Sequence, residues 1–267
     1  MTAKLFGTRS LLFLPASNPR AIEKAREAGA DLVILDLEDA VKSEHKKDAR
    51  GAAVQAAAGP WPCLLAIRVN GSGEPEHDAD VEAVSASGSD FIVLPRTTSA
   101  DEAATVGQAA GKPLIAMIET AGGLFAAREI ASVSAALLVG TNDLMADLRL
   151  PRTGGREPLR TALSMVILAA RASGVRVFDG VFNGLEDEAG LKAECAEGRM
   201  LGFDGKSLIH PRQILPCHTV FAPTDDEIAR AERLIEAATG GAERFEGEMV
   251  ERMHVEAARR LIERRSR

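Results

Sequence analysis

Charged and polar side chains close most of the apolar runs in this sequence, and these residues are the best placed to do chemistry. A run of apolar residues that ends on a polar one is typical of a buried strand whose carboxyl end opens to solvent or to a ligand. If such strands are parallel, their terminal side chains converge at one mouth of the sheet. The residues in these positions are Asp36, Glu38, Asp39, Arg68, Asn70, Arg96, Glu119, Asn142, Asp143, Asp179 and His210.

Glu119 raises the sharpest chemical question, because it ends the run LIAMIE and is followed by the small residues TAGG. A carboxylate at the rim of an apolar core is costly unless it is paired, hydrogen-bonded or bound to a metal. Asp143 follows the next run, ALLVG, so the two acids are expected on adjacent strands. Neighbouring carboxylates repel unless they share a proton or a cation, and an all-oxygen pair with open positions suits Mg²⁺. The pair therefore predicts a Mg²⁺ site, with Arg68 on another strand beside it.

Each of these residues also has a purely structural interpretation. Glu119 can cap the following helix, Asp143 can be a turn residue, and His210 can bond the backbone before Pro211. Arg68, facing carboxylates, can hold a substrate carboxylate or enolate in a bidentate grip. The segment LDLEDA has more acids than one metal needs, so some of them are expected to hold loops or to orient other ligands.

The elements that position these residues follow from the alternation of short apolar runs with segments of helical period. The runs are near-continuously apolar, as expected for strands covered on both faces. The expected strands are 11–15, 32–37, 64–69, 91–95, 114–119, 136–140, 175–182 and 203–209, and the expected helices are 19–28, 42–58, 77–86, 99–110, 123–131, 158–173 and 186–201. Repeated about eight times, this α/β alternation is most simply closed as a (β/α)₈ TIM barrel.

Helix-end signals and a change of pattern set the limits of the barrel. Ser99 and Glu102 form an S-x-x-E capping box, and Gly29 and Gly174 stand where helix ends favour a positive φ. After residue 223 the pattern is helical only, over 225–238 and 249–265, with a break at the two glycines 240 and 241. We expect a catalytic barrel domain over residues 1–223 and a C-terminal helical extension over residues 224–267.

Composition excludes several classes of protein. The 267 residues carry a formal net charge of −7 with no dense basic block, so neither nucleic acid nor a membrane surface is an expected partner. The three cysteines are far apart and form no C-x-x-C pair, which argues against a disulfide framework or a thiolate zinc site. No run has the length of a membrane span or the pattern of a signal peptide, so a cytoplasmic setting is expected.

Several segments, taken together and in order, resemble the citrate lyase β-subunit-like family. They are RSLLFLPASNPRAIEKA, DLVILDLEDAVKSEHKKDAR, IRVNGSG, FIVLPR, IETAGG, FDGVFNGLEDEAGL and LGFDGKSLIHPRQI. This family groups the citryl-CoA, malyl-CoA and citramalyl-CoA lyases within the HpcH/HpaI aldolase superfamily. The resemblance covers nearly the whole chain and leaves the individual substrate open.

The resemblance implies a (β/α)₈ barrel that forms homo-oligomers, typically trimers or hexamers, and acts on a carbon–carbon bond next to a CoA thioester. By it, Glu119 and Asp143 match the Mg²⁺ ligands and Arg68 matches a substrate-contacting arginine. Lys24 falls where family members carry a lysine near the CoA phosphates. Glu251, in EGEMVERMHV, stands where several members carry a catalytic aspartate that crosses a subunit interface. The helical extension would then pack at that interface.

The sequence also departs from the family pattern at three positions besides residue 251. Asn142 replaces the usual acid before the metal-binding aspartate, Arg96 replaces a lysine, and Gly122 replaces a bulkier residue. Glu251 keeps the carboxyl chemistry of the aspartate and adds a methylene, which changes its reach.

Three functional hypotheses follow. The first is a Mg²⁺-dependent lyase that cleaves or forms a 3-hydroxyacyl-CoA thioester, with acetyl-CoA and a 2-oxo acid as the other reactants. The second keeps the metal and removes CoA, which gives an aldolase of free 2-oxo acids. The third, prompted by the departures from the family pattern, is a catalytically degenerate binding or scaffold subunit. The acyl group, the direction and the stereochemistry of the reaction stay open.

Overall fold

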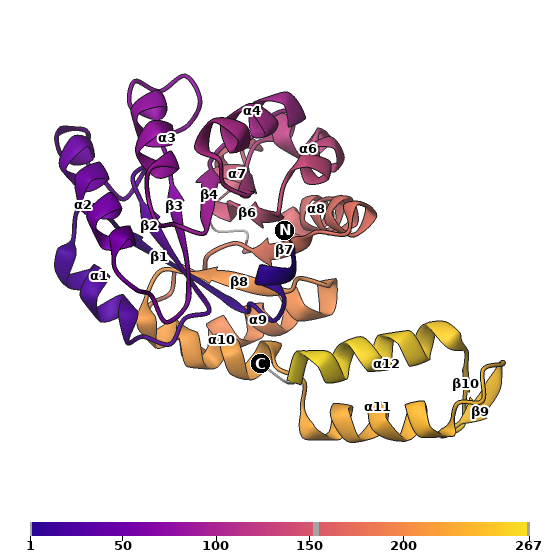
Figure 1. The fold of residues 1–267 in the computed structure, drawn as a ribbon. Helices are drawn as coiled ribbons and strands as arrows, with labels where there is room; N and C mark the ends of the chain where they lie inside the picture. The colour runs from indigo at the N-terminus through magenta and orange to yellow at the C-terminus, as the bar shows by residue number, and fades with distance from the viewer. Residues whose placement is uncertain (1, 152–154, 266–267) are drawn as a thin grey trace.

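The computed structural model describes residues 2–151 and 155–265, and within them eight parallel strands close into a barrel (Figure 1). The strands are β1 Ser10–Pro15, β2 Leu32–Asp36, β3 Leu64–Arg68, β4 Phe91–Leu94, β5 Leu114–Ile118, β6 Ala136–Val139, β7 Arg176–Asp179 and β8 Gly205–Leu208. They follow one another around the barrel in chain order, and β8 pairs with β1 to close it. The predicted TIM barrel is therefore confirmed, with each strand inside its expected segment to within one residue.

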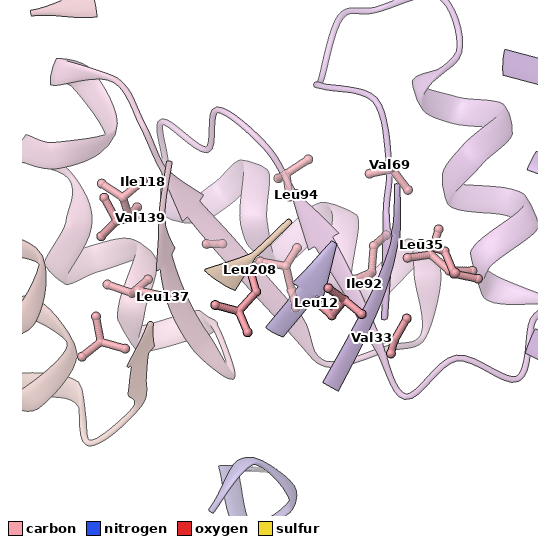
Figure 2. Packing of buried hydrophobic residues seen from close by; sticks show 14 of the residues in the cluster. Leu12, Val33, Leu35, Val69, Ile92, Leu94, Ile118, Leu137, Val139 and Leu208 are labelled. Atoms are coloured by element: carbon pink, nitrogen blue, oxygen red, sulfur yellow. The ribbon is translucent and has the colours of Figure 1, made fainter. Parts of the chain in front are cut away.

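Alternation along each strand divides the hydrophobic residues into two layers. One cluster, including Leu11, Ile34, Ala66, Val93 and Met117, fills the barrel interior. The residues between them on the same strands, among them Leu12, Val33, Leu35, Ile92 and Leu137, pack against the surrounding helices (Figure 2). Because both faces of every strand are buried, the strands are apolar throughout rather than alternating.

Helices return the chain from the end of each strand to the start of the next (Figure 1). They are α1 Pro19–Arg26, α2 Lys46–Ala58, α3 His77–Ser85, α4 Ala100–Ala110, α5 Ala121–Phe125, α6 Ala127–Val133, α7 Thr141–Asp147, α8 Arg160–Ser173, α9 Glu188–Leu201 and α10 Ile214–Phe221. The single helix expected over 123–131 is in fact two, α5 and α6, divided at Ala126. The short helices α7 and α10 were not predicted.

The predicted helix-end signals are present. Gly29 and Gly174 have φ values of 77° and 69°. The Ser99 side chain accepts the backbone N–H of Glu102, as in a capping box, but the Glu102 carboxylate accepts the N–H of Thr98 instead of that of Ser99. The reciprocal bond has thus moved one residue outward.

The C-terminal segment is a helical hairpin that projects from the barrel past α10 (Figure 1). It contains α11 Asp225–Ala237 and α12 Arg252–Arg265, joined by the antiparallel strands β9 Glu243–Phe245 and β10 Glu248–Val250. The expectation of helix only was wrong here, because β9 and β10 link the two helices at the hairpin tip. Arg264 ties α12 back to the barrel through an ion pair of 2.9 Å with Asp204. None of the helices in the described part of the chain is long and apolar enough to cross a membrane.

Candidate active site at the barrel mouth

Strand alternation brings three of the predicted residues to the carboxyl end of the barrel. Asp36 and Arg68 are the last residues of β2 and β3, and Glu119 directly follows β5. Each stands two positions after a residue that fills the barrel interior, namely Ile34, Ala66 and Met117. Because side chains two apart in a strand share a face, all three point into the mouth above the apolar interior.

Arg68 is held in place by two carboxylates. Its Nε and Nη2 donate to the two oxygens of Asp36, each over 2.7 Å, and its Nη1 lies 2.6 Å from Glu38 Oε2. The guanidinium also lies over the Phe13 ring, 5.1 Å from its centroid. Burial disfavours the charge of Arg68, yet Asp36, Glu38 and Glu119 together raise its pKa above the ordinary value. A bidentate fork of this kind fixes the orientation of the guanidinium plane.

The three acids of LDLEDA have different environments, as expected because the segment has more acids than one metal needs. Asp36 accepts the N–H groups of Glu38 and Ala40 in addition to the Arg68 fork, so it holds both the loop and the arginine. Glu38 is mostly buried beside several other acids, and its pKa is raised to about 8, mainly by burial, even though Arg68 opposes this shift. Asp39 lies at the pocket surface.

Glu119 is almost fully buried, with 2% of its surface exposed, and only one of its oxygens is satisfied. Oε1 accepts the backbone N–H of Arg96 over 2.6 Å, while Oε2 is buried without a hydrogen-bond partner. Arg96 presents that N–H from a left-handed backbone conformation with φ of 48°. The pKa of Glu119 is raised to about 7, mainly by burial and also by the nearby charge of Asp143, although the Arg96 N–H opposes this shift.

Asp143 is the second carboxylate of the pair and comes from the first turn of α7, directly after β6. β5 and β6 are hydrogen-bonded neighbours, so the predicted placement on adjacent strands is confirmed. Among the described residues no group of three or more His, Cys, Asp or Glu side chains could hold a metal. Two carboxylates with an unsatisfied oxygen between strands instead fit Mg²⁺, which takes one or two protein carboxylates and completes its octahedron with water and substrate oxygens.

Gly140 makes room for the Glu119 carboxylate. A Cβ added at Gly140 would overlap Oε2 of Glu119 and lie 2.6 Å from its Cβ. The turn between β6 and α7 therefore passes too close to the acid to carry any side chain at this position.

These groups line one pocket of about 380 Å³ at the mouth of the barrel, here called the mouth pocket. Its polar side chains are Asp36, Asp39, Arg68, Glu119, Thr141, Asn142, Asp143 and Ser207, and its apolar ones include Phe13, Met117, Val139, Val181 and Ile209. The apolar members, Thr141 and Ser207 were missed from the sequence. The sequence could nonetheless have predicted Phe13 and Met117, because each stands two residues after an interior position of its strand.

Asn142, which stands where the family usually has an acid, is neutral and makes hydrogen bonds instead. Its amide exchanges two hydrogen bonds with the amide of Asn183, over 3.3 and 2.8 Å, and this pair joins the first turn of α7 to the loop that follows β7. Asn183 was not singled out from the sequence, and no spacing signal would have found it.

Asp179 does not converge on the mouth, contrary to expectation. Phe178 is the residue of β7 that points into the barrel, so Asp179 points outward under the helices. There it accepts two hydrogen bonds from Arg156 and lies 3.2 Å from Lys206 Nζ, which in turn contacts Glu194 over 2.5 Å.

Asn70, His210 and Arg96 also lie outside the lining of the mouth pocket. Asn70 binds the buried Asp80 carboxylate, and His210 accepts the N–H of Arg212, which is its structural interpretation. The Arg96 side chain is exposed and lines a neighbouring pocket.

Two residues taken from the family resemblance are remote from the mouth pocket within one chain. Lys24 is exposed in the last turn of α1, which runs from the mouth toward the opposite end of the barrel. Glu251 follows β10 at the tip of the C-terminal hairpin, where its N–H is accepted by His254 Nδ1 (Figure 1). Both roles stay predictions, and that of Glu251 requires a second subunit.

A closed (β/α)₈ barrel with a metal-suited acidic pair at its mouth is the architecture of a metal-dependent barrel enzyme. The model of the HpcH/HpaI aldolase/citrate lyase family matches residues 9–211. A (3S)-malyl-CoA thioesterase of Cereibacter sphaeroides is 40% identical over 266 residues, which are 95% of this chain and 93% of that protein. The citrate lyase subunit beta of Escherichia coli K12 is 34% identical over 279 residues, with 96% and 92% covered.

Comparison with solved structures indicates the same family. CitE from Mycobacterium tuberculosis in complex with magnesium, acetoacetate and coenzyme A matches with a TM-score of 0.86 and 32% identity, over 97% of this chain and 98% of that one. The chain belongs to the HpcH/HpaI aldolase/citrate lyase family. As a member of this family it is a lyase, and magnesium is bound in the related CitE structures.

Proposed function

We propose that this lyase cleaves or forms a 3-hydroxyacyl-CoA thioester such as citryl-, malyl- or citramalyl-CoA, with acetyl-CoA and a 2-oxo acid as the other reactants. The observation that carries the proposal is the buried, unpartnered Oε2 of Glu119 beside Asp143 in a pocket that also contains Arg68. The names of the relatives and the coenzyme A in the related CitE structure support a thioester substrate.

The residues of the mouth pocket have distinct roles in this proposal. Glu119 and Asp143 hold Mg²⁺, which when bound acts as a Lewis acid on the 2-oxo acid unit. Arg68, kept in orientation by the Asp36 fork, balances the negative charge that develops on the reacting oxygens. In the cleavage direction a base removes the hydroxyl proton, the bond between the hydroxyl-bearing carbon and the thioester α-carbon breaks, and the hydroxyl-bearing carbon becomes the carbonyl of the 2-oxo acid. An acid then protonates the α-carbon of the released thioester enolate to give acetyl-CoA. Glu251 from a neighbouring subunit is the proposed acid/base.

The proposal extends to the surroundings of the site. Lys24 is assigned to the CoA phosphates, and the chain is taken to be a cytoplasmic homo-oligomer, a trimer or a hexamer, in which the C-terminal hairpin lies at the interface. Size-exclusion chromatography with light scattering tests the oligomer. A Lys24→Ala variant should raise the KM for the thioester and leave kcat unchanged.

The central test is an assay of the three thioesters with and without Mg²⁺, with release of the 2-oxo acid as the readout. Glu119→Ala should abolish Mg²⁺-dependent cleavage, whereas Asp101→Asn, on the exposed start of α4, is the matched surface control. Retained activity in Glu119→Ala would contradict the assignment of Glu119 as a Mg²⁺ ligand. A wild-type protein that binds neither Mg²⁺ nor a 2-oxo acid would match the scaffold hypothesis.

Isothermal titration with CoA and acetyl-CoA separates the thioester lyase from an aldolase of free 2-oxo acids. The lyase should bind both ligands, and Lys24→Ala should weaken that binding. An aldolase of free acids should show no heat of binding with either ligand while still releasing a 2-oxo acid from a hydroxy-oxo acid.

Hydrolysis of the thioester is a second candidate, because the relative with 40% identity is named a malyl-CoA thioesterase and the citrate lyase subunit is 34% identical. In hydrolysis, water adds to the thioester carbonyl, and the products are free CoA and the hydroxy acid. The lyase reaction instead gives acetyl-CoA and a 2-oxo acid. Chromatography of the products from one thioester therefore distinguishes the two reactions.

A further inference from the structure

A cluster of arginines lies where the C-terminal hairpin meets the barrel, at the end of the barrel opposite the mouth pocket. Arg9 directly precedes β1, Arg176 is the first residue of β7, and Asp204 directly precedes β8, so all three lie at the amino ends of strands. Arg171 near the end of α8 and Arg264 in the last turn of α12 reach the same place. These five residues are here called the basal joint.

The basal joint carries more positive than negative charge. Asp204, whose side chain is 3% exposed, accepts one hydrogen bond of 2.9 Å from each of Arg171, Arg176 and Arg264. The same carboxylate also accepts the backbone N–H of Val177. In the described part of the chain, a single carboxylate thus faces three guanidinium groups, which leaves an excess of two positive charges.

Neighbouring acids do not remove this excess, because each already faces a cation of its own. Arg9 Nε is buried without a hydrogen-bond partner and lies 3.6 Å from Asp31 Oδ2. Asp31 in turn lies 3.2 Å from His218 Nε2. Glu227 pairs with Arg199 over 2.7 Å.

The crowding of like charges is felt by Arg264. Its pKa is lowered, mainly by burial and also by Arg176, Arg171 and Arg199, although Asp204 opposes this shift. A guanidinium stays protonated in proteins, so the repulsion is not relieved by loss of a proton. A bound anion relieves it.

The arginines also have donors and access for an anion. Asp204 takes one N–H from Arg176 and one from Arg264, whereas a guanidinium carries five in a planar fork that suits phosphate oxygens. The gap that these two side chains line is about 10 Å³, room for roughly one water molecule. A larger anion must therefore lie at its outer edge, where the side chains of Arg264 and Arg171 are 37% and 41% exposed.

We propose that the basal joint binds a phosphate group, either as inorganic phosphate or as a phosphate monoester. A phosphate group carries a charge of about −1.5 to −2 near neutral pH, which matches the excess of the cluster. By bridging Arg264 on α12 to Arg171 and Arg176 on the barrel, it holds the hairpin against the barrel. The site is distinct from the mouth pocket and does not depend on the proposed lyase reaction.

Calorimetry of the full chain with inorganic phosphate tests the site. EDTA removes metal from the mouth pocket, and chloride at matched ionic strength is the reference, since exposed charges are screened by salt. We expect one phosphate per chain. Arg176→Gln and Arg264→Gln should each weaken binding about tenfold or more, as for the loss of a hydrogen bond to a charged group. Arg252→Gln, at the other end of α12 with 87% of its side chain exposed, should bind like the wild type.

The same titration with glucose 6-phosphate identifies the source of the phosphate. Tighter binding of glucose 6-phosphate indicates a monoester and tighter binding of inorganic phosphate indicates the free anion, and both results support the site. Phosphate that binds no tighter than chloride, or equally well to wild type, Arg176→Gln and Arg264→Gln, overturns the proposal. Arg171→Gln, at a more exposed position, replaces either variant if it does not fold.

Hydrogen exchange tests the bridge between hairpin and barrel. Phosphate should slow amide exchange in α12 of the wild type and of Arg252→Gln, and should leave it unchanged in Arg176→Gln, whose substitution lies outside the hairpin. Exchange in α12 that phosphate does not slow in the wild type contradicts the bridge.

Discussion

At the scale of single residues, the mouth pocket contains two kinds of carboxylate that differ in what satisfies them. Asp36 accepts hydrogen bonds on both oxygens from Arg68 and from the loop that follows it. Glu119 has a free, buried oxygen instead. A satisfied carboxylate orients its partner, whereas an unsatisfied one in a buried position is available for a cation. From this contrast we propose that Asp36 positions Arg68 and that Glu119 binds the metal.

The residue that permits this arrangement is Gly140, and its substitution gives a sharp prediction. Gly140→Ala places a methyl group against the Glu119 carboxylate, so Glu119 must shift from its present position. We expect the Mg²⁺ dissociation constant, measured by calorimetry, to rise about tenfold or more, as when a metal ligand is mispositioned.

The control for Gly140→Ala is Gly51→Ala, on α2, where nothing lies within 4 Å of an added Cβ. That substitution should leave Mg²⁺ binding unchanged and should stabilise the helix by up to about 1 kcal/mol. Wild-type Mg²⁺ affinity in Gly140→Ala would show that the position of Glu119 does not determine metal binding.

At the scale of elements, a buried charge cluster joins β7 and β8 to the helices outside them. Lys206 is fully buried and donates to Asp179, to Glu194 and to the carbonyl of Gly180. Ser207, the next residue, bonds the carbonyl of Asp179 and lines the mouth pocket. The cluster therefore fixes the wall of the pocket from behind.

Removal of the Lys206 ammonium should destabilise the barrel. Lys206→Met leaves the buried Asp179 and the partly exposed Glu194 short of a partner, and we expect the free energy of unfolding in urea to fall by about 3–5 kcal/mol. Lys192→Met is the matched control, because Lys192 pairs with Glu188 at the surface of α9, and its loss should cost less than about 0.5 kcal/mol. A loss below about 1 kcal/mol in Lys206→Met would be inconsistent with a strong buried cluster.

The elements also show where the sequence is informative and where it is not. The barrel was predictable because strands such as Leu32–Asp36 are buried on both faces and read as unbroken apolar runs. It was harder to predict on which face of a strand a given side chain lies. Asp179 was assigned to the mouth because it ends an apolar run, but the strand spans only four residues and Phe178 takes the inward position. β9 and β10 were missed because three-residue strands that carry Glu243, Arg244 and Glu248 give no apolar alternation.

The candidate site was predictable to a similar degree. Glu119, Asp143 and Arg68 could be found because each is a charged residue at the end of an apolar run. The fork between Arg68 and Asp36 and the clearance at Gly140 depend on the register between strands and on a backbone turn. No single sequence specifies these distances.

At the scale of the whole molecule, the raised pKa values of the mouth acids should make the stability of the metal-free protein depend on pH. The pKa of Glu38 is raised to about 8 from a reference value of 4.5. Between these values the folded protein holds a proton that the unfolded chain has lost. The free energy of unfolding should therefore fall as pH rises from about 4.5 to 8, by up to about 1.4 kcal/mol per pH unit from this group.

Urea unfolding in the presence of EDTA at several pH values between 5 and 8 measures this slope. Glu38→Gln should flatten it, while Glu23→Gln, at an exposed ion pair on α1, should leave it unchanged. A slope that is the same in wild type and Glu38→Gln would assign the pH dependence to other groups.

Mg²⁺ should oppose this decrease in the free energy of unfolding with rising pH. A cation bound to Glu119 and Asp143 replaces the proton that burial otherwise favours on Glu119. The pKa of Glu119 is raised to about 7, so protons compete with the metal at lower pH, and the gain from Mg²⁺ should be larger at pH 8 than at pH 6. A ligand that binds only the folded state at 100 times its dissociation constant stabilises by about 2.7 kcal/mol, which thermal melting at fixed pH would detect. Glu119→Gln keeps the shape of the side chain and removes its charge, so it should abolish the increment. Stabilisation by Mg²⁺ that is equal in wild type and Glu119→Gln would place the ion elsewhere on the molecule.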